Sequence, residues 1–363
     1  MVMVISLILF LLPLVALPFF SLGFETPKVL LFESCVIFFF AYGFVKNNLH
    51  FSTPLRIFLL GGVILSITTL VFSYSSTVLF NNPIRMQGLF LQGIFFLWVI
   101  ISVASSLTFR FLPFVSLGIL SLSSIFLVDL TTGRAVGLLG EPNSLGGVAV
   151  ILFVCAFFAL SKQKGKWLYQ SAGAICCLLT IFLSGSRSAL LAFLLACLLI
   201  FVMVFKKTAY RAATGISLLF LCLTLSLPFF NTNDSWENRI QVWQTALVAG
   251  WSRPVFGNGI GNTTASLKLA SQRLQNPIQY QYVDSSHNIM LDWWVQGGVL
   301  GLGILLYAFV ISFQTFIQKQ MLREFILLWT LIIILSFNPV SVSILAIFWW
   351  CIGRGFSQKT ERM

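Results

Sequence analysis

Charged side chains are scarce in this sequence. Asp, Glu, Lys and Arg together make up 9% of the 363 residues, whereas 58% are hydrophobic. Soluble domains carry about 25% charged residues, and the mean hydropathy here is +0.96. A protein with so little charge cannot cover a water-facing surface, so the composition excludes an ordinary soluble domain.

Acidic residues and histidines are rarer still, with 10 Asp and Glu and 2 His against 22 Lys and Arg. A net charge of +12 suggests a nucleic-acid partner in a soluble protein. Here the basic residues flank apolar segments, where they mark the cytoplasmic side of a membrane. We therefore expect no nucleic-acid partner.

Loop cysteines are missing as well. All seven cysteines fall inside apolar runs, namely Cys35, Cys155, Cys176, Cys177, Cys197, Cys222 and Cys351. They are typical of small core hydrophobes and suggest neither a disulfide framework nor a metal-binding spacing. No Asp-x-Asp pair occurs either, so we expect no metal site and no cofactor.

Long apolar runs are what the sequence has in abundance. Each is long enough to cross a bilayer as a helix, and each is continuous rather than alternating, which disfavours membrane strands. Twelve spans are predicted, at about 2–22, 28–45, 55–73, 88–108, 111–129, 144–160, 167–184, 188–205, 213–230, 288–316, 323–337 and 340–356. Segment 2–22 has no basic start and no small-residue cleavage site, so we expect a first transmembrane helix rather than a removed signal peptide. The prediction is an all-α polytopic bundle, with residues 1–363 forming a single integral membrane domain.

The distribution of basic residues sets the expected orientation. With twelve spans and the N-terminus inside, fourteen Lys and Arg fall on the cytoplasmic side. The other eight are Lys28, Arg85, Arg134, Arg187, Arg239, Arg253, Lys268 and Arg273. Six of these eight are arginines, whose planar fork suits phosphate or carboxylate. Both termini are therefore expected in the cytoplasm. The alternative use of the outer arginines is pairing with nearby acidic residues.

One connection is much longer than the others. Residues 231–287 lie between the ninth and tenth spans, on the outer side, and are expected to form a periplasmic loop with short helices. One helix is predicted from Trp236 to about Ala249, with Asp234 and Ser235 as its N-cap and Arg253-Pro254 beyond its end. Loops of this length inside a compact protein are usually functional.

Arg187 is the most informative candidate. It stands among small polar residues in Ser184-Gly185-Ser186-Arg187-Ser188, between two apolar spans. An arginine near a helix centre in the bilayer costs about 2.5–3.5 kcal/mol unless it faces a partner or a wet cavity. The start of the following span also favours an anion. Snorkelling to lipid headgroups is the alternative.

Arg239, Trp243 and His287 are the other candidates. Arg239 and Trp243 are spaced i, i+4 and share a helix face; an interfacial helix anchored by its tryptophan is the alternative. His287 is the one histidine predicted on the outer side, because His50 falls in a cytoplasmic loop, so it is the candidate base. Asp284, Asp292 and Asn288 are close enough in sequence to orient it, although a structural role is common for a lone histidine at a helix start.

The motifs GSRSALLAF, NRIQVW…RPVFGNGIGN and SHNIMLDWWVQGGVLGLG, in this order, resemble the O-antigen ligase and polymerase superfamily of bacterial inner-membrane glycosyltransferases. The segments NNPIRMQGL and GEPNSLGG are similar to its earlier outer-face motifs, so the resemblance covers about 81–303. It implies a GT-C-like helical fold that acts on glycans carried by undecaprenyl diphosphate. Two positions depart from the pattern: Gln296 stands where the family often has glutamate, and Glu141-Pro142-Asn143 where it has Asn-Pro-Asn.

The resemblance also implies roles for particular residues. Arg187 and Arg239 match the arginines thought to hold the donor diphosphate, and His287 matches the histidine that acts as base or positions the acceptor. The residues expected to assist substrate binding are Arg85, Arg134, Glu141, Asn143, Trp243 and Asn288. The expected partners are an undecaprenyl-diphosphate-linked glycan donor, an acceptor (lipid A core, glycan or protein) and the lipid bilayer.

The sequence favours an O-antigen ligase-like, metal-independent glycosyltransferase in the bacterial inner membrane, with its active site on the periplasmic face. An O-antigen polymerase differs chiefly in the acceptor and remains an alternative. A lipid-linked glycan flippase has a similar number of spans but is expected to carry charges along a path through both leaflets. A scaffold without catalysis leaves the arginines and the histidine unexplained.

Overall fold

The computed structural model describes residues 2–16, 24–46, 49, 51–73, 78–80, 87–105, 107, 110–161, 163, 165–205, 210–230, 234–274, 283, 285–337 and 341–357. Within this part of the chain, extended backbone pairing is confined to an isolated bridge between Val128 and Ala135. The fold is otherwise helical, so the predicted all-α class is confirmed.

Each of the twelve predicted spans contains a helix. These helices are α1 (Val2–Leu11), α2 (Glu25–Val45), α3 (Thr53–Phe72), α4 (Leu89–Ser102), α5 (Leu112–Phe126), α6 (Pro142–Ala159), α7 (Lys166–Ser184), α8 (Arg187–Phe205), α9 (Tyr210–Phe230), α12 (Ile289–Gln318), α13 (Leu322–Leu335) and α14 (Val342–Gly355). Short 3₁₀ turns η1 (Leu12–Leu14) and η2 (Gly137–Leu139) follow α1 and precede α6.

Among the described residues, α2, α3, α6, α7 and α12 are long and apolar enough to cross a membrane. Shorter apolar helices of 10–17 residues accompany them. The chain is therefore a polytopic helical membrane bundle, while the total of twelve crossings stays a prediction.

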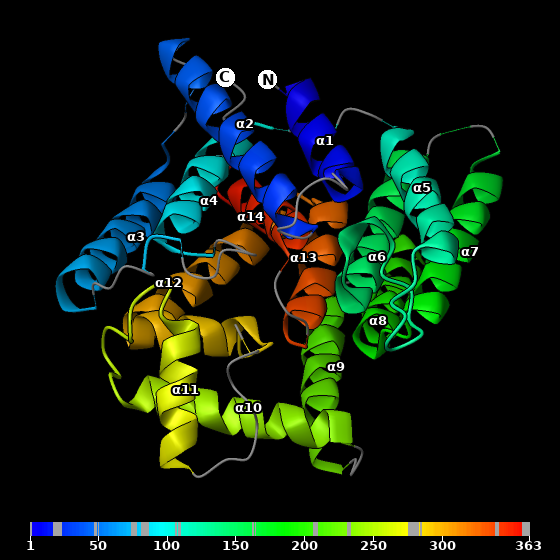
Figure 1. The fold of residues 1–363 in the computed structure, drawn as a ribbon. Coiled ribbons are helices and arrows are strands. Elements are labelled where there is room, and N and C mark those ends of the chain that lie inside the picture. Colours follow the sequence, from blue (N-terminus) through cyan, green and yellow to red (C-terminus); the bar gives the residue numbers. More distant parts are fainter. Residues whose placement is uncertain are drawn as a thin grey trace.

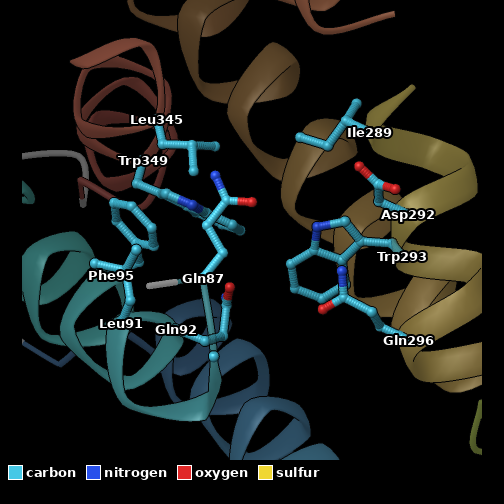
Figure 2. Close-up of a pocket in the computed structure, with 11 residues that line it drawn as sticks. Gln87, Leu91, Gln92, Phe95, Ile289, Asp292, Trp293, Gln296, Leu345 and Trp349 are labelled. Carbon is cyan, nitrogen blue, oxygen red and sulfur yellow. The ribbon is translucent and has the colours of Figure 1, made fainter. Parts of the chain in front are cut away.

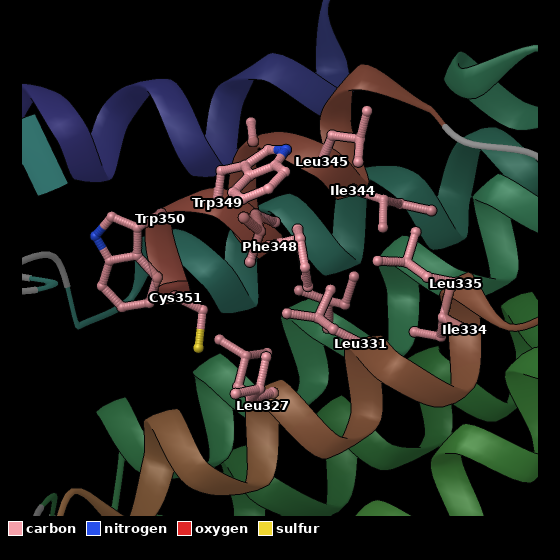
Figure 3. Close-up of a cluster of buried hydrophobic side chains, with 14 of the residues drawn as sticks. Leu327, Leu331, Ile334, Leu335, Ile344, Leu345, Phe348, Trp349, Trp350 and Cys351 are labelled. Carbon is pink, nitrogen blue, oxygen red and sulfur yellow. The ribbon is translucent and has the colours of Figure 1, made fainter. Parts of the chain in front are cut away.

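Helices α13 and α14 form the centre of the bundle. Figure 1 shows them between α5–α8 on one side and α3, α4 and α12 on the other. From Phe325 to Leu335, and from Val342 to Ile352, every residue is buried. Figure 3 shows the facing side chains of the two helices, among them Leu331, Leu335 and Phe348. Helices that are apolar all round belong in a core.

Hydrogen bonds tie the predicted outer connections to one another at one end of the bundle. They run from Lys28 Nζ to Leu138 O (2.9 Å), from Ser341 Oγ to Glu25 Oε1 (2.9 Å), from Arg134 Nε to Ser184 O (2.7 Å) and from Arg253 Nη1 to Phe72 O (2.9 Å). The predicted inner connections meet at the opposite end, from Ser52 Oγ to Phe356 O (3.2 Å), from Lys319 Nζ to Ser357 O (2.9 Å) and from Arg354 Nη1 to Val103 O (3.1 Å). The two sets of loops thus separate as the alternating topology requires.

Two helices lie at the end of the bundle that carries the outer connections. Figure 1 shows α10 (Asp234–Trp251) lying crosswise there beside α11 (Thr263–Arg273), at the far end of the molecule from the start of α1. The predicted helix from Trp236 to Ala249 is confirmed. Its start differs from the prediction, because Asp234 and Ser235 are the first helical residues rather than residues preceding the helix.

The predicted span 288–316 is not one continuous helix. Gly298, at φ 57° and ψ −147°, breaks α12 into a short first half, Ile289–Gly297, and a longer second half. This backbone region is occupied almost only by glycine. Because apolar residues precede and follow Gln296-Gly297-Gly298, the hydropathy pattern predicts a single span across the break.

The segment 254–259 stabilises this kink. Val299 N donates to Pro254 O (2.8 Å), and Asn258 N donates to Val295 O (2.8 Å). Gly257 lies so close to the break that a Cβ there would meet the backbone of Gln296. The RPVFGNGIGN stretch therefore satisfies the helical backbone groups that the kink releases, as membrane helices require.

We predict that Gly298→Ala destabilises the protein by about 1–3 kcal/mol, because alanine is strained at this φ and ψ and its Cβ would meet Pro254 O. Thermal unfolding in detergent measures the effect. Gly303→Ala in the same helix is the matched control, since nothing lies within 4 Å of a Cβ there. It should change stability by less than about 1 kcal/mol. Equal melting temperatures for the two variants would contradict this account of the kink.

Candidate active site

The predicted site residues that the structure describes lie on segments that meet at the end of the bundle covered by α10. Helices α6, α8, α12 and α14 all begin at this end, and α13 ends there. Four helix starts bring four sets of backbone N–H groups and positive dipole ends to one region. The region is therefore suited to an anionic ligand.

Arg134 is positioned by the loop between α5 and α6. Asp129 accepts hydrogen bonds from Thr131 and Thr132 and fixes the turn that precedes it. These hydrogen bonds, the backbone N–H of Thr131 first, lower the pKa of Asp129. The Arg134 guanidinium then reaches over the turn between α7 and α8, where its Nε donates to Ser184 O (2.7 Å) and its Nη2 donates to Asn143 Oδ1 (3.0 Å).

Glu141 and Asn143 hold the start of α6. The Glu141 carboxylate is the N-cap, accepting from Asn143 N (3.1 Å) and Ser144 N (2.6 Å). Carboxylates favour this position because they satisfy free N–H groups and complement the helix dipole. Glu141 is therefore a capping residue that also contributes negative charge, and Asn143 positions Arg134. A direct role of either in substrate binding stays a prediction.

Arg187 is the first residue of α8 and is exposed, directly after the turn at Gly185 and Ser186. The predicted boundary at this motif is confirmed, since α7 ends at Ser184. Ser186 is buried, and its Oγ lies 3.2 Å from Ser188 Oγ. Arg187 thus lies at the end of the bundle that carries the outer connections, where its charge is accessible to a ligand.

Arg239 lies in the same field of charge. It is half-buried on α10, and burial, followed by the guanidiniums of Arg187 and Arg134, lowers its pKa, while Glu141 opposes the shift. The interaction shows that α10 brings Arg239 close to two arginines from other parts of the sequence. Three guanidiniums and one capping carboxylate leave a net positive site, here called the arginine cluster (Arg134, Arg187 and Arg239).

An apolar cavity opens beside this cluster. It has a volume of about 520 Å³ and is lined by Leu178, Ile181, Phe182, Gly185, Ser186, Arg187 and Leu190. Phe182 is 82% exposed, so the cavity faces the surroundings of the bundle rather than its core. Its lining is apolar along α7 and α8. Among the described lining residues, Arg187 at the start of α8 carries a positive charge.

Trp243 stands one turn after Arg239 and is buried, which does not fit the alternative of an exposed interfacial anchor. Its ring packs against Phe337 at the end of α13, with centroids 5.9 Å apart, and Leu291 lies beside both. Its Nε1 is buried with no hydrogen-bond partner among the described residues. Trp243 therefore docks α10 on α12 and α13 and sets the position of Arg239. Contact with substrate stays a prediction.

His287 occupies a tight turn before α12. Its φ is 56°, uncommon for a residue other than glycine, and its backbone N–H donates to Ser285 Oγ (2.9 Å). Ser286 N donates to Asp292 Oδ1 (2.7 Å), so Asp292 holds the backbone of this turn. The turn is fixed from both sides, as expected for a residue whose position matters.

Asn288 completes the turn as the N-cap of α12. Its Oδ1 accepts from Met290 N (2.9 Å), and its Nδ2 donates to Ser336 O (3.4 Å) at the end of α13. Since Trp243 packs on the neighbouring Phe337, the end of α13 is the common contact of the histidine turn and α10. The structure thus brings the turn of His287 and the helix of Arg239 to one place.

A polar pocket on the other flank of the histidine turn was not predicted. Figure 2 shows Gln87 and Gln92 facing Asp292, Trp293 and Gln296 across it, and its remaining lining is Gly88, Leu91, Phe95, Ile289, Leu345 and Trp349. Glutamine inside the apolar run of α4 is the signal that could have indicated it. The departure at Gln296 lies here, in the same pocket as the carboxylate of Asp292.

The remaining predicted residues are either outside the described residues or bound to another part of the fold. Arg85, Asp284 and His50 lie outside the described residues, so their predicted placement has no structural counterpart here. Arg253 is one of the outer arginines, but its Nη1 donates to Phe72 O (2.9 Å) and Ser73 Oγ (3.0 Å). It stabilises the end of α3, as arginine does at helix C-termini.

Comparison with known proteins places the chain beside a family of membrane glycosyl-transferring enzymes. Residues 172–306 match the family model of the O-antigen ligase. The resemblance to the O-antigen ligase superfamily is confirmed. The O-antigen ligase match runs from α7 into the second half of α12, and it contains Arg187, Arg239 and His287.

The chain is also similar to the ComP-specific O-oligosaccharyltransferase of Acinetobacter baylyi. The two are 24% identical over 275 residues, which cover 70% of this chain and 49% of the relative. The chain thus spans about half the length of the relative it matches.

We predict that inorganic pyrophosphate raises the melting temperature of the purified protein and that Arg239→Ala abolishes this rise. At a hundredfold excess over its dissociation constant, a ligand stabilises a protein by about 2.7 kcal/mol. The melting temperature of Arg239→Ala without pyrophosphate is the baseline from which its own ligand effect is measured. Differential scanning fluorimetry in detergent measures both values.

Arg253→Ala is the matched control at the same end of the bundle. It should lower the melting temperature, because the end of α3 loses its hydrogen bonds, and it should keep the full pyrophosphate effect. An unchanged pyrophosphate effect in Arg239→Ala would remove Arg239 from the anion site.

Proposed function

We propose that the protein is a glycosyltransferase of the O-antigen ligase type. It moves a glycan from an undecaprenyl-diphosphate carrier to an acceptor hydroxyl, in the bacterial inner membrane. The observation that carries the proposal is the arginine cluster beside an apolar cavity, because a lipid diphosphate needs both. The similarity to the O-antigen ligase and to an O-oligosaccharyltransferase supports the reaction class.

In this proposal, both charge and hydrophobicity determine where the donor binds. Its diphosphate lies against Arg187 and Arg239, with Arg134 contributing from the α5–α6 loop, and its polyprenyl chain lies in the cavity along α7 and α8. Guanidiniums bind phosphate oxygens in pairs of hydrogen bonds. The lipid chain reaches the cavity sideways from the bilayer, since Phe182 and Leu190 are exposed there.

The transfer is a single displacement. His287 accepts the proton of the acceptor hydroxyl as its oxygen forms a bond to the anomeric carbon, and the bond from that carbon to the phosphate oxygen breaks. Undecaprenyl diphosphate leaves with the electron pair, and the anomeric centre inverts. The three guanidiniums neutralise the charge that grows on the leaving phosphate, a function that fixed cations perform without reorganisation. The reaction is proposed to need no divalent metal.

The acceptor is proposed to be lipid A core, with a protein side chain as the other ligase-type acceptor and another lipid-linked repeat as the polymerase alternative. Ligase and polymerase are distinguished by the product. A ligase attaches the whole polymer to the core, so its loss leaves the polymer on the lipid carrier. A polymerase extends the carrier-bound chain, so its loss leaves a single repeat unit.

We predict that His287→Ala lowers transfer from a lipid-linked glycan to lipid A core by about 10²–10⁴-fold, the usual contribution of a general base. Arg187→Ala and Arg239→Ala should each lower it by about 10²–10³-fold, as for other groups that stabilise developing charge. The assay follows radiolabelled glycan in membranes of a ligase-deficient strain. Arg56→Ala, an exposed arginine at the opposite end of the bundle, is the control and should keep full activity. Normal transfer by a folded His287→Ala variant would refute the assignment of the base.

The proposal places the arginine cluster on the periplasmic side and both termini in the cytoplasm. Leu130, between α5 and α6, is 98% exposed. Trp167, at the start of α7 and so at the end of the bundle away from the arginine cluster, is 70% exposed. We predict that Leu130→Cys reacts with a membrane-impermeant maleimide in intact spheroplasts, and that Trp167→Cys reacts only after permeabilisation. The unsubstituted chain measures the background from its own cysteines. The reverse pattern would contradict the orientation.

A further inference from the structure

The polar pocket beside the histidine turn has the chemistry of a sugar site. It is lined by residues at the start of α4, in the first half of α12 and in α14 (Figure 2). Its volume is about 60 Å³. One water needs about 10–15 Å³ measured in this way, so the pocket admits a few waters or the hydroxyl edge of a sugar. A polyprenyl chain is too large for this volume.

The polar side chains in the pocket are suited to hydroxyl groups rather than phosphate. Gln87, Gln92 and Gln296 supply amides that both donate and accept, and Asp292 supplies a carboxylate. Neither lysine nor arginine is among the described residues that line it. A carboxylate without a lining cation disfavours an anion, whereas sugar hydroxyls both donate and accept.

Gln92 has a donor that the described part of the protein does not use. Its Nε2 is buried and has no hydrogen-bond partner there. A buried donor without a partner costs about 1–3 kcal/mol. Rotation of the Gln92 amide exchanges the positions of its nitrogen and oxygen, so a ligand oxygen in the pocket would satisfy this donor and recover the free energy.

Two indoles form the apolar wall of the pocket. The rings of Trp293 and Trp349 lie 5.8 Å apart at 54°. Such walls bind the C–H faces of sugar rings, while polar groups at the edge select the hydroxyls. The pocket combines both elements at one place.

The first half of α12 separates this pocket from α10. Leu291 and Val295 face the apolar cluster on α10, whereas Ile289, Asp292, Trp293 and Gln296 line the pocket. Asp292 also accepts from Ser286 N, so the pocket wall is bonded directly to the turn that carries His287. The pocket and α10 thus lie on different faces of one short helix, with the candidate base at its start.

We propose that this pocket binds the acceptor sugar. The assignment rests on the proposed function: with the donor diphosphate on the arginine cluster, the acceptor hydroxyl approaches His287 from the opposite flank. Gln92, Gln296 and Asp292 hydrogen-bond to hydroxyls of the acceptor sugar, and Trp293 packs against its ring.

Binding is tested first, without any transfer reaction. The probes are methyl β-D-glucopyranoside, methyl β-D-galactopyranoside and N-acetylglucosamine, followed by saturation-transfer NMR with the detergent-purified full chain. At least one probe should receive saturation from the protein, and Gln92→Leu should lower that signal at least fivefold. Gln92→Leu should not lower the melting temperature, because Nε2 has no described partner to lose. Gln318→Leu, exposed at the far end of α12, is the control and should bind as the unsubstituted chain does.

Saturating pyrophosphate should leave the glycoside signal unchanged, since it binds at the arginine cluster. Displacement of the glycoside by pyrophosphate, equal signals in Gln92→Leu and the unsubstituted chain, or no signal from any probe would each overturn the subsite.

Steady-state kinetics then show whether the pocket binds the acceptor or the donor. In the transfer assay, Gln92→Leu should raise the KM for lipid A core at least fivefold and leave the KM for the lipid-linked donor unchanged. A change confined to the donor KM would overturn the acceptor assignment. If the protein binds the glycosides through Gln92 but shows no transfer activity, the proposed function is refuted and the sugar site is retained. Normal transfer with an unchanged acceptor KM in Gln92→Leu would refute the sugar site alone.

Discussion

The backbone hydrogen bonds between segment 254–259 and the kink of α12 support the whole candidate site. A membrane helix cannot end in the apolar core without partners for its N–H and C=O groups. Pro254 and Asn258 provide those partners, so α12 can break at Gly298 and turn its first half across the bundle. That half carries Asp292 and begins at the histidine turn. A straight helix would have placed these residues elsewhere.

A second constraint is electrostatic. Arg134, Arg187 and Arg239 come from three separate segments, and their mutual repulsion is compensated only in part by Glu141. The arrangement persists because packing enforces it: Trp243 docks α10 on Phe337, and Ser184 and Asn143 hold Arg134. A site that keeps like charges together at a cost to stability is typical of proteins whose function needs those charges. This is why a diphosphate ligand explains the cluster better than ordinary loop charge does.

The helices and the main candidate site residues could be predicted from the sequence, whereas the kink of α12 and the polar pocket depend on tertiary contacts. Apolar runs predict helices because length and continuity decide whether a segment can cross a bilayer, and α10 follows from its composition and from Arg253-Pro254. Arg187 and His287 stand out because polar residues between apolar spans are costly. The kink at Gly298 could not be predicted, because it depends on Pro254, some forty residues earlier. The contacts of Arg253 with Phe72 and Ser73, and of Trp243 with Phe337, depend on the tertiary structure and do not follow from the sequence. Gln92 is a polar residue in an apolar run, and its place in a pocket depends on the contacts of α4 with α12 and α14.

The central claim is that the arginine cluster holds the donor diphosphate beside the apolar cavity of α7 and α8. A cryo-EM structure of the protein with undecaprenyl diphosphate tests it most directly. The account predicts phosphate oxygens within hydrogen-bond distance of Arg187 and Arg239, with the lipid chain along Leu178 and Phe182. A diphosphate bound at another place, with both guanidiniums turned to protein groups, would contradict it.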